Sequence, residues 1–458
     1  MSDNQFKSKI GLVAATVGSA VGLGNIWRFP AEAQANGGAA FLLLYVGCVV
    51  LLGIPVMLAE FALGRGGKSD SFKVFRNLAP GKKWWIVGLM GIIASYLISI
   101  FYMVVEGWTL EYIWQSVTGG LYEGVGQLAG NGDIARADSV FTSRMAEYIN
   151  TPFAPILFTV LCILLNMAIL TGGVQKGIER LSNVLMPLLF VVLLVLCCVT
   201  LSLPGAGDGV AWFLKPDFSK ITPVTFINAM GQAFFSLSLG MGILITYSAY
   251  YPANTKLTPT ASIVAAMSLV VALMVGFVIF PAVSSFGLAD HSLVGTTLVF
   301  QTLPEVFSCL PATRVWSTLF FVLLFMAALT STVSLLEVTV AFLQESLGLS
   351  RRAACVAALS PLLVLSSVCS LSFSSLSGIT FIGMNIFGLL DAFTTNIMLP
   401  LTAIGTCVFL GWFAPKHLLR RQLTNDGSIR SRIVGSVMFI IRFLAPVIIA
   451  IILVARFV

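Results

Sequence analysis

The sequence predicts an all-α polytopic membrane protein with about 11 transmembrane helices. Hydrophobic residues make up 58% of the 458 residues and charged residues only 10%, whereas a soluble domain carries about 25% charge. Apolar runs of roughly 20 residues, the length that spans a bilayer, recur along the whole chain. The longest polar interval, residues 118–152, is expected to be a loop. We therefore interpret residues 1–458 as a single membrane domain.

Eleven apolar runs define the expected spans. They cover residues 10–35, 39–63, 85–116, 153–171, 181–203, 225–250, 259–286, 313–346, 353–371, 377–412 and 433–457. The first ten divide into two sets of five, at about 10–203 and 225–412. The run 433–457 is then an extra helix.

The positions of lysine and arginine predict the orientation. Cytoplasmic loops carry an excess of these residues. With the N-terminus in the cytoplasm, the inner loops hold 18 of them and the outer loops hold 5. We therefore expect a multi-pass protein of the cell inner (plasma) membrane, with membrane lipid around it. Its N-terminus is expected to be cytoplasmic and, because the number of spans is odd, its C-terminus outside.

Composition and motifs exclude several other classes. The net charge of +7 collects on one side of the membrane, so it does not indicate a nucleic-acid partner. The eight cysteines form no C-x-x-C pair and only His291 and His417 are present, which argues against a metal or redox site. The chain has no H-E-x-x-H motif and no nucleophile elbow, so we do not expect an enzyme.

The first span carries the most unusual stretch, Gly18–Pro30, which reads G-S-A-V-G-L-G-N-I-W-R-F-P. An arginine at membrane depth, here Arg28, is costly and is retained mainly where it faces a cavity or a partner. Gly22 and Gly24 allow a helix to unwind, and unwound backbone at that depth is tolerated where it lines a polar cavity. This stretch is therefore predicted to form half of a substrate and cation site.

The sixth span contains a matching glycine pair, Gly240 and Gly242. If helices 1–5 and 6–10 are two repeats, the two glycine pairs occupy corresponding positions. Five is an odd number, so the second repeat is inserted upside down. Broken helices at matching places in inverted repeats indicate a binding site at the membrane midplane. We expect a five-plus-five inverted repeat with helices 1 and 6 unwound at the midplane.

The eighth span offers a cluster of hydroxyl groups in A-A-L-T-S-T-V-S, residues 327–334. Oxygen ligands suit a hard cation such as sodium. If this face meets the first helix, the carbonyls of Gly18, Val21 and Ala327 complete a five-oxygen cage with Thr330 and Ser331. Hydroxyl groups in membrane helices also commonly bond their own backbone or join neighbouring helices. Both interpretations of these hydroxyls stay open at this point.

Several motifs together resemble the neurotransmitter:sodium symporter family, in particular its bacterial amino-acid transporter branch. They occur in family order from helix 1 to helix 10. Besides Gly18–Pro30, they are N-G-G-A-A-F (36–41), G-I-P (53–55), E-x-x-L-G-R (60–65), E-G-W-T-L (106–110), G-G-V-x-x-G-I-E (172–179), S-L-S-L-G-M-G (236–242), A-L-T-S (328–331) and L-L-D (389–391). The resemblance implies a sodium-driven symporter.

The resemblance also implies two sodium ions. One takes the backbone carbonyls of Gly18, Val21 and Ala327 and the hydroxyls of Thr330 and Ser331. The other takes the carbonyl of Ala20, the side chains of Asn25, Ser236 and Ser268, and the substrate carboxylate. Ser268 stands where the family has an amide or acid, which is a departure from its pattern.

A small-molecule amino acid is the implied substrate. Tyr102 matches the tyrosine that hydrogen-bonds the substrate carboxylate. The residues expected to surround the substrate are Ala20, Gly22, Gly24, Ile98, Tyr102, Val105, Phe235, Ser236, Ser238, Met241, Thr332 and Leu335. None of them is charged, and burying an unpaired charge is heavily penalised. We therefore expect neutral, hydrophobic or aromatic amino acids.

The residues that form the two gates of the family are only partly present in this sequence. Arg28 and Asp391 match the outer gate, with Tyr102 and Phe235 closing a lid beneath them. Glu345 matches the acid of the cytoplasmic gate, but Asp3 stands at the position of its arginine and Phe6 at that of its tryptophan. Either Lys7 or Lys9 replaces the arginine, or the closed inner gate is weaker here.

Charge balance is a further open question. Tyr45, Gln232, Ser236 and Ser268 match the polar set that binds chloride in chloride-dependent members. The position of the carboxylate in independent members falls on Ala272. The hypothesis is that chloride, or proton antiport through another acid, balances the charge.

The resulting prediction is sodium-coupled import of neutral amino acids by alternating access. The alternative is an amino-acid sensor on the same scaffold, which binds its ligand without moving it.

Overall fold

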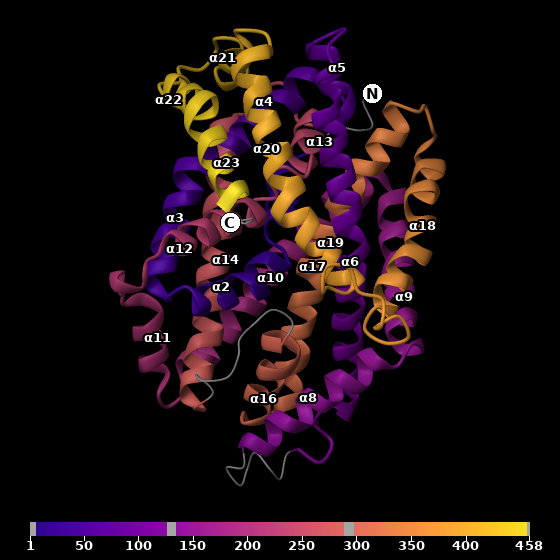
Figure 1. Ribbon diagram of the computed structural model, residues 1–458, viewed down its shortest axis with the longest axis vertical. Helices are drawn as coiled ribbons and strands as arrows, with labels where there is room; N and C mark the ends of the chain where they lie inside the picture. Colours follow the sequence, from indigo (N-terminus) through magenta and orange to yellow (C-terminus); the bar gives the residue numbers. More distant parts are fainter. Residues whose placement is uncertain (1–5, 126–133, 288–296, 456–458) are drawn as a thin grey trace.

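The computed structural model describes residues 6–125, 134–287 and 297–455, and it consists of packed helices (Figure 1). Within those residues there is no strand, only an isolated bridge between Phe381 and Met384. Nine described helices are long and apolar enough to cross a membrane, or ten if one bent pair is a single span. The sixth expected span falls on two helices that are individually too short to count. The expected number of 11 therefore stays a prediction.

The first part of the chain runs to residue 201. Its helices are α1 (Lys9–Ala20), η2 (Gly24–Arg28), α2 (Phe29–Ala35), α3 (Ala39–Cys48), η3 (Val49–Gly53), α4 (Ile54–Gly67), α5 (Ser71–Leu78), α6 (Trp85–Thr118), η4 (Gly120–Tyr122), α8 (Ile134–Asn150), α9 (Phe153–Thr171), η5 (Val174–Glu179) and α10 (Arg180–Leu201).

The second part begins at residue 206. Its helices are α11 (Ala206–Leu214), η6 (Phe218–Lys220), α12 (Pro223–Ser236), α13 (Ile243–Ala249), α14 (Leu257–Ser285), η7 (Leu298–Thr302), α16 (Leu303–Ser308), α17 (Thr313–Glu345), α18 (Arg351–Leu371), α19 (Ile386–Phe393), η8 (Thr394–Met398), α20 (Leu399–Val408), η9 (Phe409–Phe413), α21 (Leu418–Leu423), α22 (Val434–Phe439), η10 (Ile440–Leu444) and α23 (Ala445–Ala455).

Helix starts follow local side-chain chemistry. Asp70 caps α5 by accepting from the N–H groups of Phe72 and Lys73, and Ser350 caps α18 through the N–H of Ala353. Thr222 precedes Pro223 and forms a capping box with Thr225 at the start of α12. Such side chains satisfy the backbone donors that the first turn leaves unpaired.

Short connecting helices gather at the two ends of the bundle. Helices α8, α11 and α16 lie at one end and α5 and α21 at the other, near the N-terminus (Figure 1). This separation agrees with the expected division of the loops between two membrane faces.

Two helices are interrupted where the sequence places its glycine pairs. α1 ends at Ala20, and the chain resumes as η2 at Gly24 after a bend of 48°. α12 ends at Ser236, and α13 begins at Ile243. Between them Ser238, Gly240 and Gly242 have φ angles of 54°, 78° and 72°. Because glycine adopts positive φ at little cost, the glycines suit this connection.

Helix α17 lies among the other elements of the site. It packs along α6 and also against α1, α9, α10, α13 and α18. Its middle, from Phe320 to Ala341, is almost continuously buried. The hydroxyl cluster of residues 327–334 therefore faces protein rather than lipid.

Candidate functional site

The two interruptions meet in the interior. Ser238 Oγ donates to the carbonyl of Ser19 at 2.6 Å, and Gln232 Nε2 donates to the carbonyl of Gly24 at 2.8 Å. Glu60 of α4 accepts from the N–H of Gly240 at 2.8 Å. Buried backbone groups need such partners when a helix does not supply them. Glu60 had no assigned role from sequence, although it stands in the motif E-x-x-L-G-R.

A cavity of about 20 Å³ lies between these interruptions. That is room for about one water molecule. It brings together ten of the twelve residues expected around the substrate: Ala20, Gly22, Gly24, Ile98, Tyr102, Phe235, Ser236, Ser238, Met241 and Leu335. Ser19, Ile243 and Ser331 complete its lining.

Two expected pocket residues do not line this cavity. Val105 is fully buried elsewhere in the core, and the Thr332 hydroxyl donates to Asn166 Oδ1 at 2.9 Å. Asn166 in turn donates to the buried carboxyl of Glu106 at 3.1 Å. The sequence contained Glu106 in a motif but gave no indication of this contact between α6, α9 and α17.

Gly24, Tyr102 and Phe235 line both the small cavity and a larger one. The larger cavity has a volume of about 280 Å³ and is lined by Leu23, Gly24, Trp27, Arg28, Ala31, Glu32, Ala35, Phe101, Tyr102, Phe235 and Asp391. The rings of Tyr102 and Phe235 lie 6.4 Å apart. A β-carbon on Gly24 would lie 2.6 Å from Phe235 Cδ1, so glycine leaves room for this ring. Tyr102 and Phe235 thus lie together at both cavities, and their role as a lid stays a prediction.

The expected gate residues Arg28 and Asp391 line the same larger cavity. The Arg28 guanidinium lies 4.9 Å from the centre of the Phe235 ring, and its Nε is 3.7 Å from Glu32 Oε1. A cation over an aromatic face is attracted to it. Arg28 therefore contacts the lid directly, while its pairing with Asp391 as a gate stays a prediction.

The first expected sodium set lies where α1 meets α17. A β-carbon on Gly18 would lie 3.4 Å from Thr330 Cβ, and one on Gly22 would lie 2.3 Å from Ser331 Oγ and 4.0 Å from the carbonyl oxygen of Ala327. Thr330 Oγ1 donates to Met326 and Ala327, both at 3.1 Å. The buried Ser331 hydroxyl has no hydrogen-bond partner. A buried oxygen of this kind needs a partner such as water or an ion, and its use as a sodium ligand stays a prediction.

The second expected sodium set surrounds Asn25. Asn25 Nδ2 donates to the Ser268 carbonyl at 3.1 Å and to Ser268 Oγ at 2.9 Å. Asn25 Oδ1 is buried and unpaired. Ser268 Oγ donates to the carbonyl of Ser236 at 3.4 Å, which joins α14 to the break after α12. This oxygen is free to accept from a water molecule or to bind a cation, and the second sodium site stays a prediction.

The polar set considered for chloride lies beside this group. Tyr45 Oη and Ser236 Oγ are 2.9 Å apart, and Gln232 reaches Gly24. Gln232 Oε1 is buried without a partner. Ala272, at the position of the family's alternative carboxylate, is also fully buried. The four polar residues thus share one buried region between α3, α12 and α14.

The expected acid of the cytoplasmic gate contacts α5. Glu345 Oε2 accepts from the N–H of Asp70 at 2.7 Å, and Lys73 Nζ donates to the Glu345 carbonyl at 3.2 Å. Burial raises the pKa of Asp70, whose carboxylate also accepts from Ser346 at 2.9 Å. Asp3 lies outside the described residues. Lys7 contributes its backbone N–H, which donates to Glu179.

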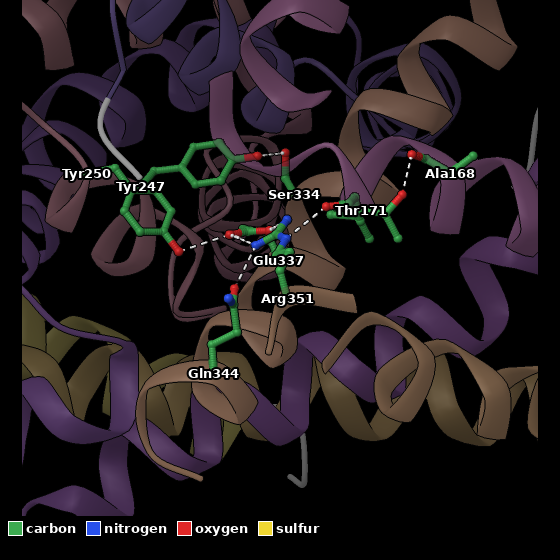
Figure 2. Close-up of polar contacts among 9 residues, drawn as sticks. Ala168, Thr171, Tyr247, Tyr250, Ser334, Glu337, Gln344 and Arg351 are labelled. Atoms are coloured by element: carbon green, nitrogen blue, oxygen red, sulfur yellow. Dashed lines mark hydrogen bonds and ion pairs between the residues drawn. The ribbon is translucent and has the colours of Figure 1, made fainter. Parts of the chain in front are cut away.

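A buried ion pair joins several helices near Glu345 (Figure 2). Arg351 Nη2 of α18 lies 2.6 Å from Glu337 Oε2 of α17. Tyr250 donates to Glu337 Oε1 at 2.9 Å, and Arg351 also donates to Gln344 and to the carbonyl of Leu170. Sequence reasoning counted Arg351 only as a loop charge and gave Glu337 no role. An acidic residue inside an apolar span, as Glu337 is, indicates a buried partner, and this signal could have predicted the ion pair.

Comparison with known proteins gives a family match. Residues 3–124 and 144–458 match the model of the sodium:neurotransmitter symporter family. An uncharacterized sodium-dependent transporter of Bacillus subtilis is 35% identical over 448 residues, which cover 98% of this chain and 96% of the relative. A second uncharacterized sodium-dependent transporter, from Haemophilus influenzae, is 36% identical over 92% of this chain and 91% of its own length.

A solved structure has the same fold. The crystal structure of MhsT in complex with L-phenylalanine matches with a TM-score of 0.87 and 39% identity. The match covers 98% of this chain and 99% of that one.

Proposed function

The chain belongs to the sodium:neurotransmitter symporter family, a family of multi-pass membrane transporters, and from that premise we propose a specific activity. The protein imports neutral, hydrophobic or aromatic amino acids together with sodium, by alternating access. We further propose that it lies in the cell inner membrane with its N-terminus in the cytoplasm. Its five-plus-five inverted repeat brings the two interrupted helices together at the midplane.

The observation that carries this proposal is the lining of the small cavity. Its thirteen residues include no charged side chain, while Ile98, Met241, Ile243 and Leu335 supply apolar surface. A charged substrate side chain would be buried there without a partner, and the free-energy cost of such burial is roughly several kcal/mol. The MhsT complex contains L-phenylalanine, an amino acid of the class proposed here.

The interrupted helices suit the charged ends of an amino acid. Backbone N–H groups at the start of a helical segment attract an anion, and carbonyl groups at the end of one attract a cation. The substrate carboxylate is proposed to lie near Gly22 and Gly24, with Tyr102 as a hydrogen-bond donor. The cavity must widen to admit a substrate, and the unbranched side chain of Met241 allows that adjustment.

Two sodium ions are proposed to drive import. The unpaired oxygens of Ser331 and Asn25 support one site at the α1–α17 contact and a second around Asn25. Each positive charge that moves inward gains about 2.3 kcal/mol per 100 mV of membrane potential. Chloride, or proton antiport, is proposed to balance part of that charge.

The test uses the purified full-length protein. Binding of radiolabelled amino acids is measured in sodium and in potassium, with competition by each of the twenty amino acids. We expect sodium-dependent binding that neutral apolar amino acids compete and that lysine or aspartate does not. Strong competition by a charged amino acid would overturn the proposed substrate class.

Counterflow in proteoliposomes then separates transport from sensing. Exchange of internal unlabelled for external labelled amino acid is expected in a sodium gradient. Binding without exchange would contradict import and support a sensor instead.

A further inference from the structure

The segment that leads into the first helix is fastened to the side chain of Glu179. The carboxylate lies at the end of η5 and is 5% exposed. It accepts from the backbone N–H of Lys7 at 2.9 Å, from the N–H of Ser8 at 3.0 Å and from Ser8 Oγ at 2.9 Å. Ser8 is the N-cap of α1 and itself accepts from the N–H of Gly11 at 2.8 Å. One carboxylate therefore binds both residues that precede α1, including its N-cap.

Electrostatics favour this contact. The start of a helix carries a partial positive charge, so a carboxylate placed there is stabilised. Hydrogen bonds to an ionised acceptor are about twice as strong as neutral ones. Three such bonds converge on Glu179, and their donors come from two consecutive residues.

Gly11 makes the approach of Glu179 possible. A β-carbon at this position would lie 2.3 Å from Glu179 Cγ and 2.4 Å from Oε1. Any other residue would push the carboxylate away from the start of α1. By contrast, a β-carbon on Gly47 of α3 would meet nothing within 4 Å.

The same segment packs over the end of α13 (Ile243–Ala249). Phe6 is 3% exposed, its N–H donates to the carbonyl of Tyr250 at 3.4 Å, and its ring packs edge-on against Tyr247 at 6.0 Å. Tyr247 donates to Ser334 at 2.8 Å, one turn along α17 from Thr330 (Figure 2). If this segment moves away, we expect Tyr247 and then Ser334 to become more exposed to solvent.

Asp3 stands at the position of the family's gate arginine, and Glu345 contacts α5 through Asp70. We propose that Glu179 is the gate residue that holds the cytoplasmic side of this protein closed. The N-terminal latch, defined as Phe6–Gly11 with Glu179, opens when α1 moves away from η5. This inference rests on the proposed transport function, because α1 also carries the carbonyls of Gly18 and Val21 toward one sodium ion.

The test measures access to the covered pathway. A reporter cysteine replaces Ser334, which is 2% exposed, in protein whose less buried cysteines Cys198 and Cys309 are changed to serine. The rate of thiol labelling is measured in Glu179→Gln, a change that keeps the size of the side chain and removes its charge. The same rate is measured in Gly11→Ala, with Gly47→Ala as the matched control.

We expect Glu179→Gln and Gly11→Ala each to raise the labelling rate roughly tenfold, and Gly47→Ala to leave it unchanged. Since release of α1 dismantles the sodium site, the sodium concentration for half-maximal amino-acid binding should rise in the same two variants. Thermal unfolding is measured in parallel as a control for stability. If the two variants have a lower melting temperature but an unchanged labelling rate and an unchanged sodium requirement, the contact is only structural and the proposal is overturned.

The two proposals fail in different ways. If the wild-type protein binds amino acids with sodium but Glu179→Gln labels at the wild-type rate, the latch is wrong and the transport function stands. If the wild-type protein shows no sodium-dependent binding, the proposed function is wrong, and a raised labelling rate in both variants would still support the latch.

Discussion

The Ser331 hydroxyl of α17 faces Gly22, so that a β-carbon on Gly22 would lie 2.3 Å from Ser331 Oγ. This contact brings the interruption of the first helix against a buried oxygen that has no hydrogen-bond partner. A side chain on Gly22 would therefore occupy the space that we assign to a sodium ion.

Gly22→Ala is expected to weaken sodium-dependent amino-acid binding at least about tenfold, because the added methyl group displaces Ser331 Oγ from the α1–α17 contact. The measurement is a sodium titration of amino-acid binding. Gly47→Ala, which adds a methyl group in open space on α3, serves as the control. Unchanged sodium affinity in Gly22→Ala would contradict the assignment of Ser331.

Removal of the proposed ligand oxygens should have a larger effect. Asn25→Ala, and Thr330→Ala combined with Ser331→Ala, are each expected to abolish sodium-dependent binding. Both remove oxygen ligands from a buried cation site, which neighbouring groups cannot replace. The assay compares equilibrium binding in sodium and in potassium.

Ser99→Ala provides the matched control for this loss. Ser99 is a fully buried hydroxyl of α6 that donates to the carbonyl of Ser95 in its own helix. It should keep near wild-type sodium affinity. Wild-type affinity in either ligand variant would remove that residue set from the sodium site.

Much of the fold could be predicted from the sequence, because glycine pairs and charged residues inside apolar spans are unfavourable and occur mainly where a helix is interrupted or lines a cavity. Gly22, Gly24 and the Gly240–Gly242 pair indicated interruptions, and the structure breaks helices at those places. Long apolar runs likewise indicated the helices on either side. Ten of the twelve expected pocket residues gather around one cavity for the same reason: the motifs lie on the helices that these breaks bring together.

Side-chain direction could not be read from the sequence. Thr332 lies next to Ser331, yet its hydroxyl turns to Asn166 on α9. Glu60 and Glu179 are acids whose partners lie far away in the sequence, at Gly240 and Ser8, while Glu337 pairs with Arg351 on the following helix. Their roles depend on which helices pack together. A helix that is apolar on all its faces has no periodic pattern that predicts its neighbours.

The Glu337–Arg351 ion pair is expected to show strong coupling in stability. Glu337 is fully buried and the Arg351 side chain is 15% exposed, with Arg351 Nη2 and Glu337 Oε2 2.6 Å apart. Removal of one partner leaves the other charge buried and unpaired, so Glu337→Gln and Arg351→Met should each destabilise the fold by about 3–5 kcal/mol.

A double-mutant cycle on thermal unfolding in detergent tests this expectation. The double variant should lose less stability than the two single losses added together, because it leaves no unpaired charge. Additive losses would show that the two side chains do not stabilise each other.

The lid can be tested through the rate at which substrate leaves. Phe235 lines both cavities, and the Arg28 guanidinium lies 4.9 Å from the centre of its ring. Phe235→Ala opens this barrier, so bound amino acid should dissociate roughly tenfold faster in sodium, a change of about 1.4 kcal/mol in the barrier. Filter-binding dissociation curves measure the rate. An unchanged rate would mean that Phe235 does not cover the substrate.

Chloride dependence gives the last prediction. Tyr45, Gln232, Ser236 and Ser268 share one buried region, where hydroxyl groups such as those of Tyr45 and Ser236 can donate to an anion. An anion beside the second sodium site would offset its positive charge where little water can do so. Sodium-driven uptake should therefore fall several-fold when gluconate replaces chloride.

In Ala272→Glu, a fixed carboxylate takes the place of the mobile anion, so the remaining uptake should no longer depend on chloride. Wild-type uptake that is the same in gluconate would rule out the chloride site and leave proton antiport as the means of charge balance.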